Sequence, residues 1–416
     1  MELSVIVIGI GLLVFLAHLF SLMFERFHVP DVLFLFGIGI VLGPVTGVLS
    51  AESFGQFGSL FALLTLLIML FEAGLDMKIR QVLGALGPAM ALMVLNLVGS
   101  IAIIVPAAYF IFGIPLHLAF LVSILVGGIS SGIVIPLAEQ LKLGDKTKAI
   151  LALESNLNNV VTVVLILALL QFSDTQAFRI FPIISETLVG FLGAVVLGGV
   201  IALVWSRLLL PIRGIQDSIF TTPAVVLIVY GLAEFVGTNG IMAAFAFGIT
   251  LGNLEFLKVR PLPLLRHLEA FHLTLQEKNL FSGMVFLLKT YFFVFIGISM
   301  NITNIPYLLW GVAVVLAFLV LRDATARLVL RQSLPSFDLE ILKRMMPKGL
   351  VGAALVSLVA NQTVQDLTYP IILFSIVFTS ILIFWAKRKK PAASSLAVPV
   401  ADRPVPPPPF FTEEVK

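Results

Sequence analysis

Long apolar runs recur along this chain from its N-terminus to Trp385, separated by short polar connectors. About 20 apolar residues are the length that an α-helix needs to cross a bilayer. The pattern predicts about 13 such spans, at approximately 3–24, 32–49, 57–75, 86–112, 115–141, 147–172, 182–208, 217–236, 238–257, 279–300, 304–331, 344–361 and 368–386. We therefore expect an all-α polytopic membrane protein, with a transmembrane domain over 1–386 and a cytoplasmic, Pro-rich disordered tail over 387–416.

The distribution of basic residues predicts how the chain is oriented in the membrane. Cytoplasmic loops carry an excess of Lys and Arg. If the N-terminus lies outside, the predicted inner segments hold nearly all the basic residues near span ends, and Arg179 is the basic residue of the outer loops. With an odd number of spans, the C-terminus then lies in the cytoplasm.

The composition excludes several classes of protein. The 416 residues are 59% hydrophobic and only 12% charged, which is far less polar than a soluble domain. The absence of Cys excludes disulfides and thiol nucleophiles. The net charge of +3 is small and is explained by the loops, so we expect a lipid bilayer and no nucleic acid as partner. No metal-hydrolase, phosphate-loop or hydrolase motif is present, which argues against an enzyme.

Two spans are interrupted by residues that break helices. The fifth contains Gly127-Gly128-Ile129-Ser130-Ser131-Gly132 followed by Pro136, and the twelfth contains Pro347-Lys348-Gly349 and Gly352. Interrupted helices at matching places in two halves of a chain point to an inverted-repeat transporter with a site near the middle of the membrane. We expect discontinuous helices at spans five and twelve.

The sixth span carries polar side chains where hydrocarbon is expected. They belong to the run Glu154-Ser155-Asn156-Leu157-Asn158-Asn159. Polar groups at membrane depth are costly and usually face the bundle interior, where they mark an ion or substrate pathway. This run predicts a transport site.

Several motifs resemble the cation:proton antiporter superfamily, which includes the sodium/proton exchangers. Glu154 to Asn159 is similar to the Glu-Ser-x-x-Asn-Asp sequence of these exchangers, and the order of the other motifs agrees. Those motifs are Phe71-Glu72-Ala73-Gly74-Leu75-Asp76, Leu232-Ala233-Glu234-Phe235-Val236-Gly237, Ala243-Ala244-Phe245-Ala246-Phe247-Gly248 and Phe292-Phe293-Val294-Phe295-Ile296-Gly297-Ile298.

The resemblance implies a fold of 13 helices, with a dimerisation part and a core part that includes 86–172 and 304–386. It implies a homodimer that exchanges Na⁺, K⁺ or Li⁺ for protons by an elevator-like motion, without a cofactor. The compact length suggests the inner membrane of a bacterium or archaeon.

The chain departs from this family at its central acid. Asn159 stands where the exchangers have the carboxylate that holds cation and proton in turn, and Ile129-Ser130-Ser131 replaces the Thr-Asp-Pro of many exchangers. An amide oxygen can ligate a hard cation, but an amide does not titrate. We expect Asn158, Asn159, Ser155 and the fifth-span break to form the ion site, with Asn159 and Ser155 as cation ligands.

Four basic residues are candidate charge partners. In the family picture Glu154 pairs with an arginine of the eleventh span, and Arg322 is better spaced for this than Arg327. Alternatively, Glu154 itself takes over the titration. Lys289 lies near mid-membrane and resembles a lysine that electrogenic members set against a core acid. Lys348, in the twelfth-span break, is expected to offset carbonyl dipoles.

Three functions remain open at this point. The first is a cation:proton antiporter with relocated proton chemistry. The second is an uncoupled channel or uniporter for cations or another solute, which an amide at position 159 favours. The third is a transport-inactive sensor on the same fold.

Overall fold

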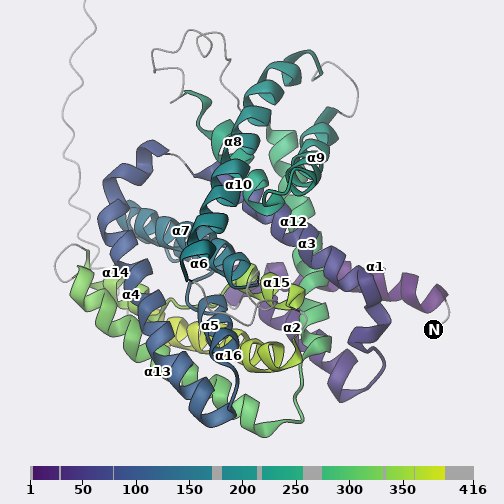
Figure 1. Ribbon diagram of the computed structural model, residues 1–416. Helices are drawn as coiled ribbons and strands as arrows, with labels where there is room; N and C mark the ends of the chain where they lie inside the picture. Colours follow the sequence, from purple (N-terminus) through teal and green to yellow (C-terminus); the bar gives the residue numbers. More distant parts are fainter. Residues whose placement is uncertain are drawn as a thin grey trace, which may run out of the picture.

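The computed structural model describes residues 3–27, 30–77, 79–170, 180–212, 218–255, 274–330, 334–359 and 361–388 (Figure 1). All regular secondary structure within these ranges is helical. The predicted all-α class is confirmed.

The first half of the chain contains α1 (Leu3–Phe27), α2 (Asp31–Ile40) with a π-helical continuation (Val41–Val45), α3 (Ala51–Asp76), α4 (Ile79–Phe112), α5 (Leu116–Leu125), α6 (Ser131–Gln140) and α7 (Asp145–Leu170). The second half contains α8 (Ile180–Ile212), a 3-10 turn (Ser218–Phe220), α9 (Thr221–Phe235), α10 (Gly240–Gly252), α12 (Leu275–Ser299), α13 (Ile305–Leu330), α14 (Ser336–Arg344), α15 (Leu350–Leu358) and α16 (Gln362–Arg388).

Each predicted span contains one of these helices or a pair of short helices separated by a break. Within the described ranges, six helices are long and apolar enough to cross a membrane, namely α4, α7, α8, α12, α13 and α16. The chain is a multi-pass membrane protein, while the count of 13 crossings stays a prediction. Helix α16 continues to Arg388, so the predicted tail would begin slightly later than expected, and residues 389–416 lie outside the described ranges.

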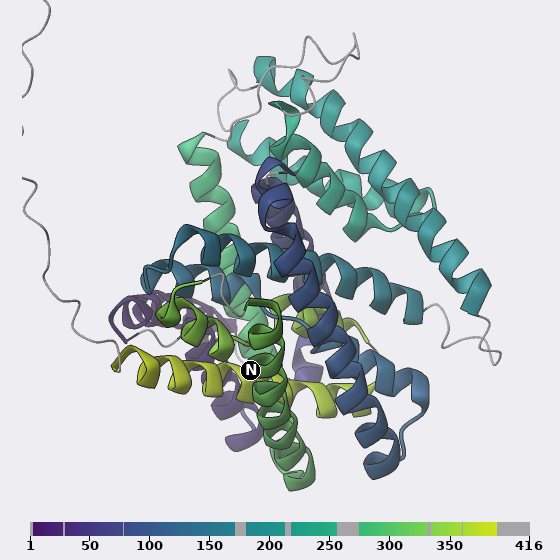
Figure 2. The same ribbon diagram turned by 90° about the vertical axis from the view of Figure 1, so that its left-hand side faces the viewer.

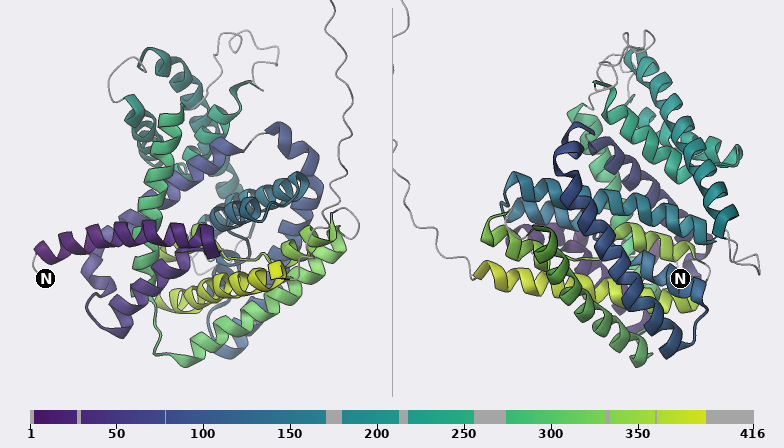
Figure 3. Two further views of the ribbon diagram at one scale, coloured as in Figure 1. Left: turned by 180° about the vertical axis from the view of Figure 1, so that it is seen from behind. Right: turned by 60° about the vertical axis from the view of Figure 1, so that its left-hand side comes forward.

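The helices pack in two groups. In one, α3 packs on α10, α10 on α8, and α12 on α2 and α3. In the other, α4 packs on α5, α7 and α13, and α13 packs on α16. Figures 1 and 2 show α8, α9 and α10 at one end of the molecule, away from α13 and α16, and Figure 3 shows α1 projecting from the bundle at its N-terminal end. The main contact between the groups is that of α15 with α3.

The expected interruptions occur in both spans. Helix α5 ends at Leu125 and α6 begins at Ser131, while α14 ends at Arg344 and α15 begins at Leu350. Pro136 and Gly352 do not break their helices and lie inside α6 and α15. The discontinuous helices predicted for spans five and twelve are therefore present.

The predicted bounds of the twelfth span, 344–361, were wrong. Its first half begins at Ser336, and the break lies in the middle of the element rather than near its start. Hydropathy missed this half because α14 carries four charged residues among nine. Protein surrounds Asp338 of this helix: the residue is buried and accepts hydrogen bonds from Gly144 N (2.9 Å) and Thr147 Oγ1 (2.7 Å) at the start of α7.

Candidate functional site

The two helix breaks lie against each other in the middle of the second group of helices. Ser130 N, in the first break, donates a hydrogen bond to Pro347 O, in the second, over 2.8 Å. Lys348 N donates to Ser375 Oγ of α16, also over 2.8 Å. These hydrogen bonds satisfy backbone N–H and C=O groups that have no helical partner where the helices unwind. The crossing of the two breaks also brings the N-termini of α6 and α15 close together. These N-termini carry partial positive charge, and the ends of α5 and α14 carry partial negative charge.

The amides of α7 face the first break. Asn159 Nδ2 donates a hydrogen bond to Ser131 Oγ over 3.1 Å, and Asn158 Nδ2 donates to Thr162 Oγ1 over 3.3 Å. Both asparagines are buried. A β-carbon built on Gly128 would overlap the Asn158 carboxamide, so this amide rests directly on the unwound backbone. Glycine is required at position 128 by this close approach.

Two buried amide oxygens of α7 have no hydrogen-bond donor among the described residues. They are Oδ1 of Asn158, which lies against the first break, and Oδ1 of Asn156. A buried acceptor without a donor costs free energy, and such oxygens are ligands for a hard cation. Among the described residues no group of three or more His, Cys, Asp or Glu is placed to hold a metal ion.

Ser155 and Ile129 take less direct positions than the sequence predicted. Ser155 is buried but its hydroxyl donates to Ala152 O of its own helix over 3.1 Å. Ile129 is an apolar wall of a neighbouring small cavity. Asn158, Asn159, Ser130 and Ser131 are therefore the predicted residues that the fold brings together at the crossing.

Glu154 forms a buried ion pair with Arg322 of α13. Arg322 Nη2 lies 2.9 Å from Glu154 Oε2, and Nη1 contacts Oε1 as well, so the pair is bidentate. Arg322 Nε also donates to Leu342 O of α14 over 3.2 Å. Charge-assisted, bidentate contacts of this kind fix geometry strongly. The pair joins α7 and α13 to the last turn of α14, which precedes the second break.

Two further polar residues complete this network, and sequence reasoning missed both. Asn96 Nδ2 of α4 donates to Glu154 Oε1 over 3.2 Å, and Thr325 Oγ1 of α13 donates to Asn96 Oδ1 over 3.1 Å. The available signal was an amide in the middle of the apolar span 86–112.

Arg327 is not an alternative partner of Glu154. Its side chain is 66% exposed and pairs with Asp323 one turn earlier, over 2.8 Å, whereas the Arg322 side chain is 2% exposed. The two arginines are five residues apart and therefore point to different sides of α13. Burial, which the sequence does not state, distinguishes them.

Lys289 also has a partner other than the expected core acid. Its Nζ lies 2.7 Å from Asp31 Oδ2, at the start of α2. Both residues belong to the first group of helices, so Lys289 links α12 to α2 by an ion pair. Sequence reasoning missed Asp31 because the residue lies directly before an apolar run, in a predicted connector.

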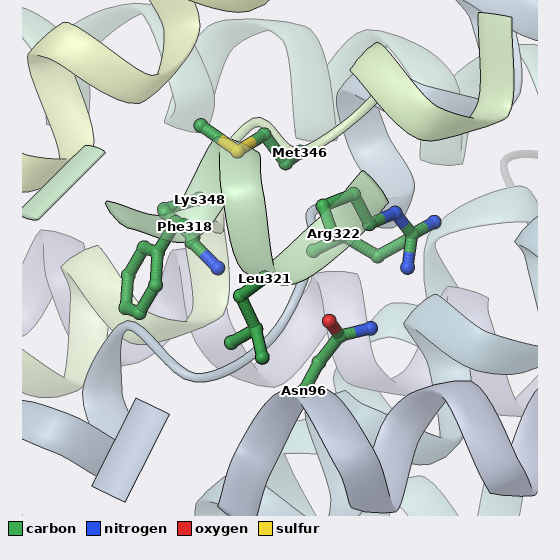
Figure 4. Close-up of a pocket in the computed structure, with 7 residues that line it drawn as sticks. Asn96, Phe318, Leu321, Arg322, Met346 and Lys348 are labelled. Carbon is green, nitrogen blue, oxygen red and sulfur yellow. The ribbon is translucent and has the colours of Figure 1, made fainter. Parts of the chain in front are cut away.

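Lys348 is buried at the second break with a 4% exposed fraction. Its Nζ lies 4.1 Å from the centroid of the Phe318 ring. Figure 4 shows its side chain in a small cavity beside Arg322 and Asn96; Ile129, Leu321 and Met346 also line it. The cavity volume is about 10 Å³, which is the volume that about one water molecule requires.

Comparisons with known proteins agree with this architecture. The family model of the transmembrane sodium/hydrogen exchangers matches residues 11–388. Over 252 residues the chain is 25% identical to the K(+)/H(+) antiporter NhaP2 of Shewanella baltica (strain OS223), a match that covers 58% of this chain and 43% of that protein. The matched part is thus less than half of that relative's length.

Two solved structures of the sodium proton antiporter MjNhaP1 from Methanocaldococcus jannaschii are similar in fold. One superposes with a TM-score of 0.73 at 18% identity and covers 94% of this chain and 99% of the other. The second has a TM-score of 0.67 at 20% identity and covers 93% and 96%. Similarity at this level of identity shows a shared fold.

Proposed function

Because the chain belongs to the sodium/hydrogen exchanger family, we propose that it is a secondary transporter that exchanges a monovalent cation, Na⁺, K⁺ or Li⁺, for protons across a membrane. The relative from Shewanella baltica is described as a K⁺/H⁺ antiporter, and MjNhaP1 as a sodium proton antiporter. The single observation within this chain that carries the proposal is the free Oδ1 of Asn158, buried against the unwound backbone at Gly128.

The cation would be bound by neutral oxygen ligands. Asn158 Oδ1 supplies one, Asn159 and the Ser131 hydroxyl lie beside it, and Ser155 is one turn away on α7. Neutral oxygens replace part of the hydration shell of a cation without trapping it, which suits a site that must release its substrate. Selectivity among Na⁺, K⁺ and Li⁺ depends on cavity size and ligand number.

Glu154 is proposed to hold the site together rather than to carry the proton. Both of its oxygens accept from Arg322, and Oε1 also accepts from Asn96. A carboxylate that accepts this many charge-assisted bonds is held in one position between α4, α7 and α13. The alternative, in which Glu154 titrates, requires this network to open at each turnover.

A second candidate function is an uncoupled cation pathway. It is favoured by one observation, the amide of Asn159 at the position of the family's titrating carboxylate, because an amide alone gives no reason for protons to move with the cation.

The test is a flux assay on purified protein in liposomes with an imposed pH gradient. Na⁺, K⁺ or Li⁺ is added in turn, and internal pH and tracer cation are read together. Antiport predicts proton movement tied to one of the cations, and Asn158→Leu, which removes the free oxygen, should abolish both signals. Tracer uptake without proton movement would contradict antiport and support the uncoupled pathway. If a folded protein changes neither the internal pH nor the tracer uptake, the result would support the transport-inactive sensor.

We further propose a homodimer in a prokaryotic inner membrane, with its N-terminus outside and its C-terminus in the cytoplasm. The resemblance to the family supports the dimer, and the positions of the basic residues support the orientation.

A further inference from the structure

The core of the molecule contains two basic side chains and one carboxylate at the helix crossing. Arg322 and Lys348 both line the small cavity in Figure 4, and Glu154 is the acid beside them. The charged groups that act on Lys348 are Arg322 of α13 and Glu154 of α7. The other side chains around it, Asn96 of α4, Ile129 of the first break and Ser375 of α16, do not titrate.

Glu154 is already neutralised by Arg322. The guanidinium uses Nη1 and Nη2 to bind the two carboxylate oxygens. No carboxylate of the described residues forms an ion pair with Lys348, whose Nζ contacts the face of Phe318 instead. A buried charge without a counter-ion is costly, and a lysine, unlike an arginine, can relieve that cost by releasing its proton.

The backbone of Lys348 is tied to the cation site. Pro347, which precedes it, accepts the hydrogen bond of Ser130 N, and the Ser131 hydroxyl next along the chain accepts from Asn159. One backbone hydrogen bond between the two breaks thus joins the residue before Lys348 to the residue before Ser131, whose hydroxyl is proposed to hold the cation. In a medium of low dielectric constant, like charges repel over longer distances than in water.

We propose that Lys348 is the proton carrier of this transporter, in place of the carboxylate that Asn159 has lost. The inference rests on the proposed function. When Nζ keeps its proton, the ammonium disfavours a cation at Asn158 and Asn159. When the proton leaves to water, the nitrogen retains its lone pair and the cation binds. The site thus carries either a proton or a cation, and each form moves one positive charge.

This scheme differs from exchange on one carboxylate. In exchange on a carboxylate, the proton and the metal cation compete for the same oxygen atoms. In the scheme proposed for this chain, the proton is on Lys348 and the cation is at the asparagines, and each disfavours the other by charge repulsion. One proton is exchanged for one monovalent cation, so transport should be electroneutral and insensitive to membrane potential.

The experiment measures proton release on cation binding. Purified protein in weakly buffered detergent solution receives the cation that the flux assay identifies, with a pH indicator present. Wild type should release about one proton per cation bound, as expected for a single titrating group. Lys348→Met should bind the cation and release almost none. Lys348→Arg, permanently charged, should lower cation affinity by about tenfold or more across the pH range.

A structural role for Lys348 predicts the reverse order. If its charge merely offsets carbonyl dipoles, Lys348→Arg should behave as wild type and Lys348→Met should lose stability. Should Lys348→Met fail to fold, the arginine variant decides alone, since wild-type binding in it overturns the proposal. The matched control is Asp31→Asn with Lys289→Met, which removes another membrane-depth lysine together with its partner and should leave the proton count unchanged.

Two failures are distinguishable in this experiment. Wild type that binds a cation without releasing a proton would overturn the proposed antiport. Proton release by wild type that persists in Lys348→Met would overturn the role of Lys348 and leave antiport intact.

Discussion

Asn159 contributes an amide to the proposed cation site, and Asn159→Asp exchanges the amide nitrogen for an oxygen with little change in shape. Asn159→Asp places a negative charge beside Ser131, whose hydroxyl can turn to donate to it. Since charge-assisted contacts are about twice as strong as neutral ones, we expect the KM for the transported cation to fall by about tenfold. Proteoliposome flux measures this, with Asn159→Leu as the inactive control. An unchanged KM in a folded Asn159→Asp protein would place the cation elsewhere.

The Glu154–Arg322 pair is expected to stabilise the fold in a way that a surface pair does not. Glu154→Gln leaves Arg322 buried without its carboxylate, next to Lys348, and should lower the free energy of unfolding by about 3–5 kcal/mol. Arg327→Gln removes the base of the exposed pair with Asp323 and should cost about 0–1 kcal/mol. Unfolding in detergent compares the two variants, and similar losses would contradict the buried network.

At the scale of elements, α2 and α12 approach closely because glycines face each other. A β-carbon on Gly39 would lie 2.8 Å from the Cα of Gly297, so the two backbones touch. Gly39→Ala must push the helices apart and should cost about 1–3 kcal/mol. Gly37→Ala is the matched control on the same helix, because nothing lies within 4 Å of its built β-carbon, and alanine is the better helix former. Thermal unfolding of both variants tests this; equal stabilities would show that the contact yields without cost.

The breaks in α5/α6 and α14/α15 are also features of elements rather than of residues. Each break leaves backbone groups without helical partners, and the contact of Ser130 N with Pro347 O satisfies one group from each break at once. The two interruptions therefore support each other, which explains why they occur together.

At the scale of the whole molecule, the orientation in the membrane can be tested directly because the chain contains no Cys. Thr303 follows α12 and Ser336 begins α14, and both are exposed. With the N-terminus outside, we expect an impermeant maleimide added to intact cells to label Thr303→Cys and not Ser336→Cys. Permeabilised cells should show labelling of both, which verifies that each cysteine is accessible. The opposite pattern would invert the orientation.

The sequence by itself determined the helical class, the approximate spans, the two breaks and the polar run on α7, because hydrophobic periodicity and helix-breaking residues act locally. It also ranked Arg322 above Arg327 by spacing. Tertiary structure alone decided partners. Lys289 pairs with Asp31, Asn96 and Thr325 complete the network of Glu154, and Lys348 has no carboxylate partner in the part of the chain that the structure describes. It also revealed α14, which hydropathy does not detect because the helix is rich in charged residues. The buried Asp338 of α14 is stabilised by hydrogen bonds from Gly144 and Thr147 at the start of α7. The physical reason is the same in each case: the free energy of a buried charge depends on which distant segments surround it, and hydropathy along the chain contains no information about those neighbours.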